Sequence, residues 1–487
     1  MQNILISRKL PAAFALLAVL ASVIIGIVAY YKSSESLDEA FEAKLAGLAA
    51  SRGAALKNYL RSLREDLRTQ AENPRMLEAF EALQAGWVAL GGNQESILQK
   101  AYITDNPNKA GEKHKLDAAP AANAYNLAHA KYHPWIRKFL EERGYYDIFL
   151  FAPNGDLVYT VFKELDYATN LLNGKWKDTD LGNAFKSAIA GKAGEEHFFD
   201  FKAYAPSNGA PAAFLSMPLH DAAGKITGVL AFQMPIDRIN KVMQVSEGMG
   251  KTGETYIVGA DLLMRSDSRF SKESTILKTK IDTAAARAGI SGKKGVMIGK
   301  DYRGEEVMSA FYPTEFLGSK FVVLAEIDFA EIEAPVFALR NFMLIILAFV
   351  IAGSIAAGIF MARTITSPIG KIREAIDRVA EGEFSAEIPG TGRGDEIGTM
   401  AKSLTRIRDD AAKAGELMVM IDTMPFNVMT CDPSTFNINY ANTTSIETLR
   451  QLEDLLPISA DEVVGASVDK FCNELASQHG MLGDPAR

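Results

Sequence analysis

The sequence predicts an α+β membrane protein with two transmembrane helices, an exported β-rich region between them and a cytoplasmic helical bundle. Residues 342–362 form an uncharged apolar run of 21 residues, and residues 10–31 form a second apolar run. Each is long enough to cross about 30 Å of hydrocarbon. Between them, pairs of β-rich segments with tight turns occur twice, and after the second run apolar residues recur at helical spacing.

Length and charge limit the function classes. At 487 residues the chain exceeds one hydrophobic core, which favours about three domains. The formal net charge of −8 and the pI near 5.5 argue against a nucleic-acid partner, because such partners select a basic surface. We therefore expect a membrane as one partner and no nucleic acid.

The first apolar run fits either a cleaved signal peptide or a retained anchor. It follows Arg8 and Lys9, as a signal peptide would, but secretory apolar regions span only about 7–15 residues. This run is longer and continues into Tyr30-Tyr31-Lys32 without an Ala-x-Ala site. Tyrosines also suit the membrane interface. These features favour a retained span.

Basic residues in the short flanks predict the orientation. Arg8 and Lys9 precede the first span, and four more follow the second: Arg363, Lys371, Arg373 and Arg378. By the positive-inside rule both flanks are cytoplasmic, so residues 32–340 face outward. Both cysteines, Cys431 and Cys472, then lie on the reducing side. We expect a two-pass protein of the bacterial inner membrane with a periplasmic sensor region.

A long amphipathic helix opens the exported region. Leucines and Phe41 form a stripe at 3–4 spacing between residues 37 and 67, and Asn73-Pro74 ends it. A helix of this length needs a partner, either a second copy in a dimer seam or globular lobes that pack on it as on a spine.

Beyond the helix, one antiparallel unit recurs. Residues 147–151 and 157–162 flank an Asn-Gly turn and predict a hairpin, and residues 214–219 and 226–234 predict another. The second copy pairs 255–258 with 262–266 and 306–312 with 320–327. Two copies of one α/β unit on a long helix describe this region.

At this point the exported region resembles a double Cache sensor domain, which has two PAS-like lobes on a long helix. The run Gly253–Val258 leading to Leu263–Phe270 is similar to the membrane-proximal lobe of such receptors. The resemblance implies a distal lobe at about 75–235 and a proximal lobe at about 240–330.

Two heptads after the second span predict a parallel bundle. Neither helix can bury its stripe alone, so we expect a homodimer with a four-helix bundle. Pro368 and Asp395-Glu396 suit the first turns of the two helices. This segment resembles a HAMP linker, and an ordinary coiled coil is the alternative. The signal-converting residues are Ile365, Pro368, Ile369, Ile372, Ile376, Val379, Phe384, Ile388, Asp395, Glu396, Ile397, Met400, Leu404 and Ile407.

The complete order of parts resembles the methyl-accepting chemotaxis receptors of bacteria. From residue 416 on, two β segments around Asp432-Pro433 and a helix from Thr443 to Leu455 resemble the opening of a PAS domain. About 70 residues are short of the roughly 100 that such a module needs, so we expect a partial PAS domain and no signalling hairpin after it. The expected domains are 1–9, 10–31, 32–340, 341–362, 363–415 and 416–487.

No catalytic constellation emerges from the sequence, so we expect no enzyme and no metal site. His129 and His133 have ligand spacing but no third ligand nearby, which favours surface or pocket-lining roles. Cys472 with His479 suggests a haem or flavin ligand only weakly, and we expect no cofactor.

The resemblance places a small ligand in the distal lobe. Aromatic side chains would form a stacking wall, a cation would hold a carboxylate and an aspartate would hold an amine. The ligand would be an amino acid or an organic acid. The candidate residues are Trp135, Arg137, Tyr146, Tyr159, Lys163, Asp166 and Asp200.

Three functions stay open from the sequence. The favoured one is a transmembrane chemoreceptor that signals through HAMP to a chemotaxis output. The second is the sensor portion of a membrane histidine kinase or diguanylate cyclase, and the third is a truncated product that binds ligand without signalling. The chemotaxis kinase and adaptor are expected partners only if an output region exists.

Overall fold

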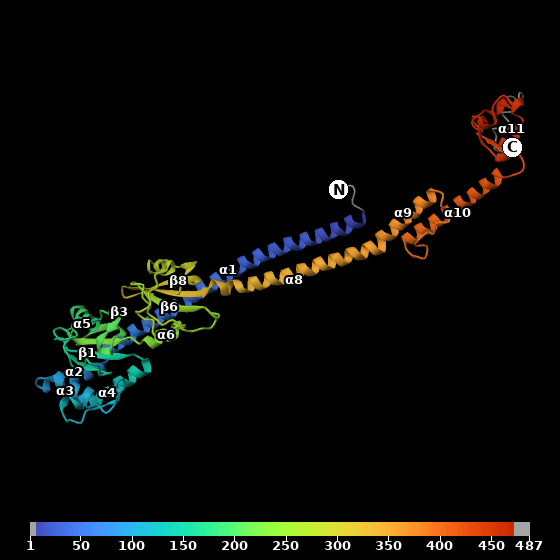
Figure 1. The fold of residues 1–487 in the computed structure, drawn as a ribbon. Coiled ribbons are helices and arrows are strands. Elements are labelled where there is room, and N and C mark those ends of the chain that lie inside the picture. Colours follow the sequence, from blue (N-terminus) through green and yellow to red (C-terminus); the bar gives the residue numbers. More distant parts are fainter. Residues whose placement is uncertain (1–5, 472–487) are drawn as a thin grey trace. The chain divides into compact units, whose positions relative to one another are not determined.

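The computed structural model describes residues 6–471 and divides into two compact units (Figure 1). One unit comprises Gly26–Phe342, and the other comprises the described residues on either side of it. Each unit is described by itself. The first contains both lobes of the sensor region, and the second contains the HAMP segment.

Helix α1 (Ile6–Ala71) is continuous from the first apolar run into the sensor region. Within the sensor region its stripe packs on both lobes: Leu45 and Ala49 join the core of the proximal lobe, whereas the leucines from Leu56 to Leu67 join that of the distal lobe. Gly53 leaves room for Tyr312, whose ring lies 2.4 Å from where a Cβ would be. The helix therefore serves as the spine on which both lobes pack.

The distal lobe is built on a five-stranded antiparallel sheet in the order β2-β1-β5-β4-β3. Helices α2 and α4 cover the face that packs on α1, and α5 covers the other. Its strands are β1 (Asp147–Phe151), β2 (Leu157–Thr160), β3 (His197–Tyr204), β4 (Ala210–His220) and β5 (Ile226–Gln233). Its helices are α2 (Pro74–Ala89), α3 (Gln94–Gln99), η1 (Lys100–Thr104), η2 (Lys113–Lys115), α4 (Ala124–Arg143), α5 (Asp180–Ala190) and η3 (Ala205–Ser207).

The proximal lobe has a four-stranded antiparallel sheet in the order β6-β9-β8-β7. Helix α7 (Ala284–Ile290) packs on one face and α1 on the other. The strands are β6 (Glu254–Gly259), β7 (Gly295–Lys300), β8 (Glu306–Phe316) and β9 (Ser319–Asp328), and α6 (Ile236–Met243) joins the two lobes.

The prediction of a strand at 262–266 is wrong. This segment makes only isolated bridges, between Val258 and Met264 and between Leu263 and Lys280, because Leu262 has a left-handed backbone (φ 66°) that interrupts an extended strand. The sequence reasoning also missed β3 and β7, which lie at sheet edges.

Helix α8 (Phe329–Met361) follows β9 without a loop, and a π turn, η4 (Ala362–Thr366), joins it to α9 (Ser367–Ala380). By length and composition, α1 and α8 can each cross a membrane. After α10 (Glu396–Asp422) come β10 (Met429–Cys431), β11 (Ile438–Ala441), α11 (Thr443–Gln451), η5 (Glu453–Leu455), η6 (Ala460–Glu462) and η7 (Val468–Lys470). Cys472 and His479 lie outside the described residues.

Candidate ligand site and signal-transmitting elements

The distal lobe contains a cavity of about 510 Å³ at the end of β2. Two of the predicted ligand residues, Tyr146 and Lys163, line it. Its wall carries both signs of charge, since Lys113 and Lys163 face it together with Glu164. The other lining residues are Ile103, Ala110, Gly111, Phe162, Leu165, Pro206, Ser207 and Asn208.

Glu164 is the acidic group of this cavity, and sequence reasoning missed it. It accepts a hydrogen bond of 2.8 Å from the Tyr146 hydroxyl and another from Ser207. Burial raises the pKa of Glu164, while the two hydroxyl donors oppose that shift. Its position next to Lys163 in the sequence is the signal that could have identified it.

Lys163 is 2% exposed, and its ammonium lies over three tyrosine rings. The Nζ atom is 4.5 Å from the ring centre of Tyr159, 5.0 Å from Tyr167 and 5.7 Å from Tyr102. It also donates a hydrogen bond to the Thr160 carbonyl. Burial lowers the pKa of Lys163, and the nearby Asp147 carboxylate opposes this.

Two stacked histidines of α4 lie next to Tyr159, one of the tyrosines that contact Lys163. The rings of His129 and His133 are 4.3 Å apart, and His133 Nδ1 is 2.7 Å from the Tyr159 hydroxyl. Both side chains are buried, so the surface role considered from the sequence is wrong. Burial, followed by the charge of Lys163, lowers the pKa of both imidazoles, which keeps them neutral near pH 7. No group of three or more metal-ligating side chains occurs among residues 6–471.

Two buried aspartates complete the polar interior of the distal lobe. Asp147 accepts hydrogen bonds from the amides of Ile148 and Val161, at 2.7 and 2.8 Å, and from the Thr160 hydroxyl. Asp166 accepts from Tyr204 at 2.6 Å, and burial raises its pKa to about 7. Its other oxygen, Oδ1, has no hydrogen-bond partner among the described residues.

The remaining predicted residues lie elsewhere. The guanidinium of Arg75 lies over Trp135, with its central carbon 5.1 Å from the centre of the indole ring. Arg137 forms an ion pair of 2.8 Å with Asp117. Neither lines the cavity.

Asp200 is at the junction of the two lobes rather than in the distal cavity. From β3 it accepts hydrogen bonds from Arg265 Nε at 3.0 Å and Nη2 at 2.8 Å. Arg265 belongs to the proximal lobe and also contacts Asp261 at 2.9 Å. Both Arg265 nitrogens donate to the same Asp200 oxygen, Oδ2, and these charge-assisted hydrogen bonds hold the two lobes together at this point.

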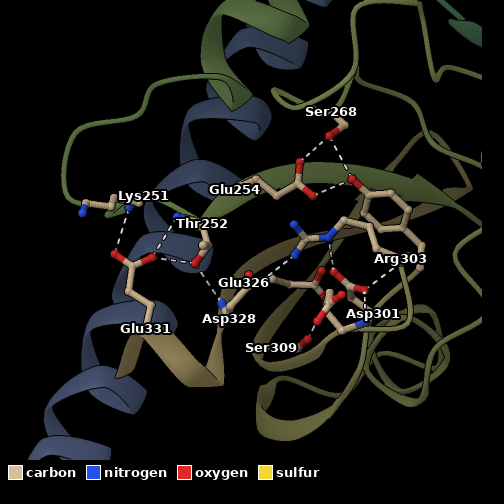
Figure 2. Close-up of polar contacts among 12 residues, drawn as sticks. Lys251, Thr252, Glu254, Ser268, Asp301, Arg303, Ser309, Glu326, Asp328 and Glu331 are labelled. Carbon is tan, nitrogen blue, oxygen red and sulfur yellow. Dashed lines mark hydrogen bonds and ion pairs between the residues drawn. The ribbon is translucent and has the colours of Figure 1, made fainter. Parts of the chain in front are cut away.

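The proximal lobe carries a buried network of carboxyl and hydroxyl groups (Figure 2). Glu254 and Glu326 are direct cross-strand partners on β6 and β9, and both are buried. Glu326 accepts from Tyr256 at 2.6 Å and Ser309 at 2.5 Å. The other carboxyl, Glu254, accepts from Ser268 at 2.6 Å and Tyr302 at 2.7 Å.

Glu331, in the first turn of α8, fastens that helix to the loop before β6 (Figure 2). Its carboxylate accepts from the amides of Lys251 and Thr252, at 2.9 and 2.8 Å, and from the Thr252 hydroxyl at 2.6 Å. The same hydroxyl accepts from the Asp328 amide at 3.1 Å. Burial alone would raise the pKa of Glu331, but these hydrogen bonds lower it.

In the HAMP segment the predicted heptad positions fall into two sets. Ile372, Val379, Ile397 and Leu404 are buried between α9 and α10, together with Ile388 of the connector, and Phe384 packs against them. The other apolar positions stay exposed: Ile365, Ile369, Ile376, Met400 and Ile407.

The two helices enclose an apolar groove of about 590 Å³, lined in part by Ile376, Met400 and Ile407. Pro368 lies in the first turn of α9. Asp395 caps α10 by accepting from the Gly398 amide at 3.1 Å, and Glu396 is in the first turn of that helix.

Comparison with known proteins agrees with this architecture. Residues 33–336 match the Cache domain family, and residues 360–411 match the HAMP domain. Because the first match covers more than half of the chain, this protein belongs to the Cache domain family. The family resemblance drawn from the sequence is therefore confirmed for the Cache and HAMP parts, whereas the partial PAS domain stays a prediction.

Similar proteins include a probable chemoreceptor, y4sI, of Sinorhizobium fredii. It is 23% identical over 413 residues, which cover 83% of this chain and 51% of that protein. The chain thus spans about half the length of this curated relative.

Two solved structures are also similar. The periplasmic sensory domain of the Campylobacter jejuni chemoreceptor Tlp1 covers 61% of this chain and 99% of its own, at 12% identity and a TM-score of 0.38. The ligand-binding domain of the Pseudomonas aeruginosa amino acid chemoreceptor PctC, in complex with GABA, covers 59% of this chain and 100% of its own. Its sequence identity is 16% and its TM-score is 0.36.

Proposed function

We propose that this chain is the sensing and transmembrane part of a bacterial chemoreceptor. The observation that carries the proposal is the order of its parts: a Cache domain at 33–336 lies between two apolar helices and is followed by HAMP at 360–411. The similarity to a probable chemoreceptor extends along most of the chain. In this proposal the protein is a receptor without catalytic activity.

The proposed ligand is a small extracytoplasmic solute that binds in the distal cavity. A volume of about 510 Å³ is within the range of small-molecule sites. Because Lys113 and Glu164 bring opposite charges to the wall, the cavity suits an amino acid or an organic acid.

The proposed signal route runs from the distal lobe to α8. The junction between the lobes is held by the Asp200–Arg265 pair, and α6 continues into the loop that Glu331 fastens to α8. A rearrangement of the distal lobe would therefore pull on the helix that leads to HAMP. Packed interfaces of this kind switch between discrete arrangements rather than deforming continuously.

A second copy of the chain is the proposed occupant of the HAMP groove. Ile369, Ile376 and Ile407 are exposed at heptad positions, and a parallel four-helix bundle would bury them. The receptor would then be a homodimer of the inner membrane with its Cache domain outside the cytoplasm. The chemotaxis kinase and adaptor are partners only of a protein that also carries a signalling hairpin.

Thermal unfolding of the full chain in lipid nanodiscs tests ligand binding. One class among amino acids and carboxylic acids should raise the unfolding midpoint of the sensor region, by mass action on the folded state. The shift should shrink in Glu164→Gln, which changes the cavity wall, and persist in Glu142→Gln, which changes an exposed residue of α4. If no small solute raises the midpoint, the proposed receptor function is wrong.

A chimera tests signalling. Residues 1–411 joined to the signalling hairpin of a characterised chemoreceptor should control its kinase in response to the stabilising solute. A chimera that binds the solute without changing kinase activity would leave the ligand site in place but contradict the proposed chemotaxis output.

A further inference from the structure

The aromatic box around Lys163 has the chemistry of an ammonium-binding site. The centres of three tyrosine rings lie 4.5 to 5.7 Å from the Nζ atom. The same atom donates hydrogen bonds to the carbonyl oxygens of Thr160 and Val161. Aromatic boxes of this kind recognise alkylammonium ligands, because the ring faces are negative. Here the cation that fills the box belongs to the chain itself.

The backbone at Lys163 supports a specific placement of this side chain. Its φ of 65° lies in the left-handed region that residues with a Cβ rarely adopt. The side chain bends back onto the carbonyls of the preceding residues, and Lys163 is one of the residues that line the distal cavity. Box and cavity are therefore neighbours, separated by one side chain.

We propose that Lys163 is a specificity-determining residue, a built-in cation that occupies the tyrosine box beside the distal cavity. With the box filled, a ligand cannot place its own ammonium group among Tyr102, Tyr159 and Tyr167. The distal cavity then prefers carboxylic acids without an amino group to the matching amino acids. This ligand preference rests on the proposed receptor function, whereas the filled box does not.

Chemical rescue of the full chain tests the box. Lys163→Gly suits the left-handed backbone and removes every side-chain carbon, so n-butylammonium can replace the missing group. We expect n-butylammonium to raise the unfolding midpoint of Lys163→Gly saturably, by roughly 2–4 °C for an interaction of about 1 kcal/mol. Wild type, whose box is filled, should show no such rise.

Matched controls separate the box from general effects of charge or hydrophobicity. Lys113→Gly removes another lysine of the same cavity, and Lys163→Met leaves an apolar stem in the box. Neither should respond to n-butylammonium, and n-butanol should not rescue Lys163→Gly. If Lys163→Gly is too unstable to purify, Lys163→Ala with n-propylammonium provides the same comparison. Equal responses of Lys163→Gly and Lys113→Gly would overturn the proposal.

Matched ligand pairs test the preference. Wild type should bind propionate at least about 10-fold more tightly than alanine, and Lys163→Gly should narrow or reverse that ratio. Wild type that prefers alanine would contradict the proposed specificity. If the chain binds neither compound but n-butylammonium still stabilises Lys163→Gly, the result supports the filled box and contradicts the proposed receptor function.

Discussion

At the scale of single residues, buried polar groups in this protein sit where neighbouring strands force them together. Glu254 and Glu326 face each other across β6 and β9, and each is satisfied by two hydroxyl groups (Figure 2). Burial and the like charge of Glu254 directly opposite both disfavour the charged form of Glu326. Burial is the main reason that the pKa of Glu326 is raised to about 7, and the hydroxyl hydrogen bonds oppose it.

The raised pKa of Glu326 predicts a pH-dependent stability of the proximal lobe. The folded chain keeps this proton at a higher pH than the unfolded chain. The protonated Glu326 side chain therefore stabilises the folded state fully at pH values below the ordinary pKa of a glutamate. This contribution is lost as the pH rises through about 7. Glu326→Gln is neutral at every pH, so its unfolding midpoint should rise relative to that of wild type between about pH 5 and pH 8.

The control is Glu306→Gln, which changes an exposed glutamate of β8. Its midpoint should run parallel to wild type across the same range. Thermal unfolding at a series of pH values measures both variants. If the unfolding midpoints of Glu326→Gln and wild type differ by the same amount at every pH, the pKa of Glu326 is not raised on folding.

At the scale of elements, the join between the proximal lobe and α8 is the part best placed to carry motion. β9 ends at Asp328 and α8 begins at Phe329, so the sheet and the helix share one continuous backbone. Glu331 adds a second attachment to the loop at residues 250–253. Gly250 has φ 67°, and a Cβ there would meet Glu331 Oε1 at 2.5 Å, so this loop needs glycine to wrap the carboxylate.

Glu331→Gln should loosen this attachment. A neutral amide offers one acceptor oxygen where the carboxylate offers two, and each lost hydrogen bond is worth about 1 kcal/mol. Hydrogen exchange of the Lys251 and Thr252 amides in the full chain should therefore become about 5-fold faster. Glu333→Gln, two residues further along α8, should leave those amides unchanged, and an equal effect of both variants would argue against a specific attachment.

At the scale of the whole molecule, the described residues of α9 and α10 expose apolar surface that a second copy would cover in the proposed homodimer. The HAMP groove lies between α9 and α10 and is lined almost entirely by apolar side chains. Ile407 is 61% exposed at a heptad position of α10. Burying such residues is the main driving force of helical bundles.

Ile407→Asp should weaken the homodimer at least about 10-fold, because a carboxylate would have to enter the apolar seam. Lys402→Asp places the same side chain on the outer face of α10, where Lys402 is exposed, and should leave association unchanged. Sedimentation of the full chain in detergent measures the monomer–dimer equilibrium. Unchanged association of Ile407→Asp would exclude this face as the dimer interface.

Local pattern predicted much of this fold. The run at 342–362 becomes the apolar length of α8, Asn73-Pro74 marks the passage from α1 to α2, and hairpins appear where turn residues separate β-rich segments. These features depend on residues close in sequence, whose spacing reports the period of a helix or a strand. The edge strands β3 and β7 escaped prediction because they are only partly buried and lack clean alternation.

The candidate site was predicted in part. Tyr146 and Lys163 do line the distal cavity, but Asp200 instead pairs with Arg265, which lies 65 residues further along the chain. The charge of a residue can be read from the sequence, while its partner depends on which surfaces meet. Tyr159 was among the predicted residues, but its association with Tyr102 and Tyr167 around Lys163 was missed for the same reason.

By itself, then, the sequence determined the membrane spans, the spine helix, the repeated α/β unit and the heptads, since each is either a continuous apolar run or a set of apolar residues at helix or strand spacing. Only the tertiary structure decided which polar groups share an environment: Lys163 with three tyrosines, Glu254 with Glu326, and Glu331 with the loop before β6. The physical reason is that burial and hydrogen bonding between distant segments exist only after the two lobes have packed on α1.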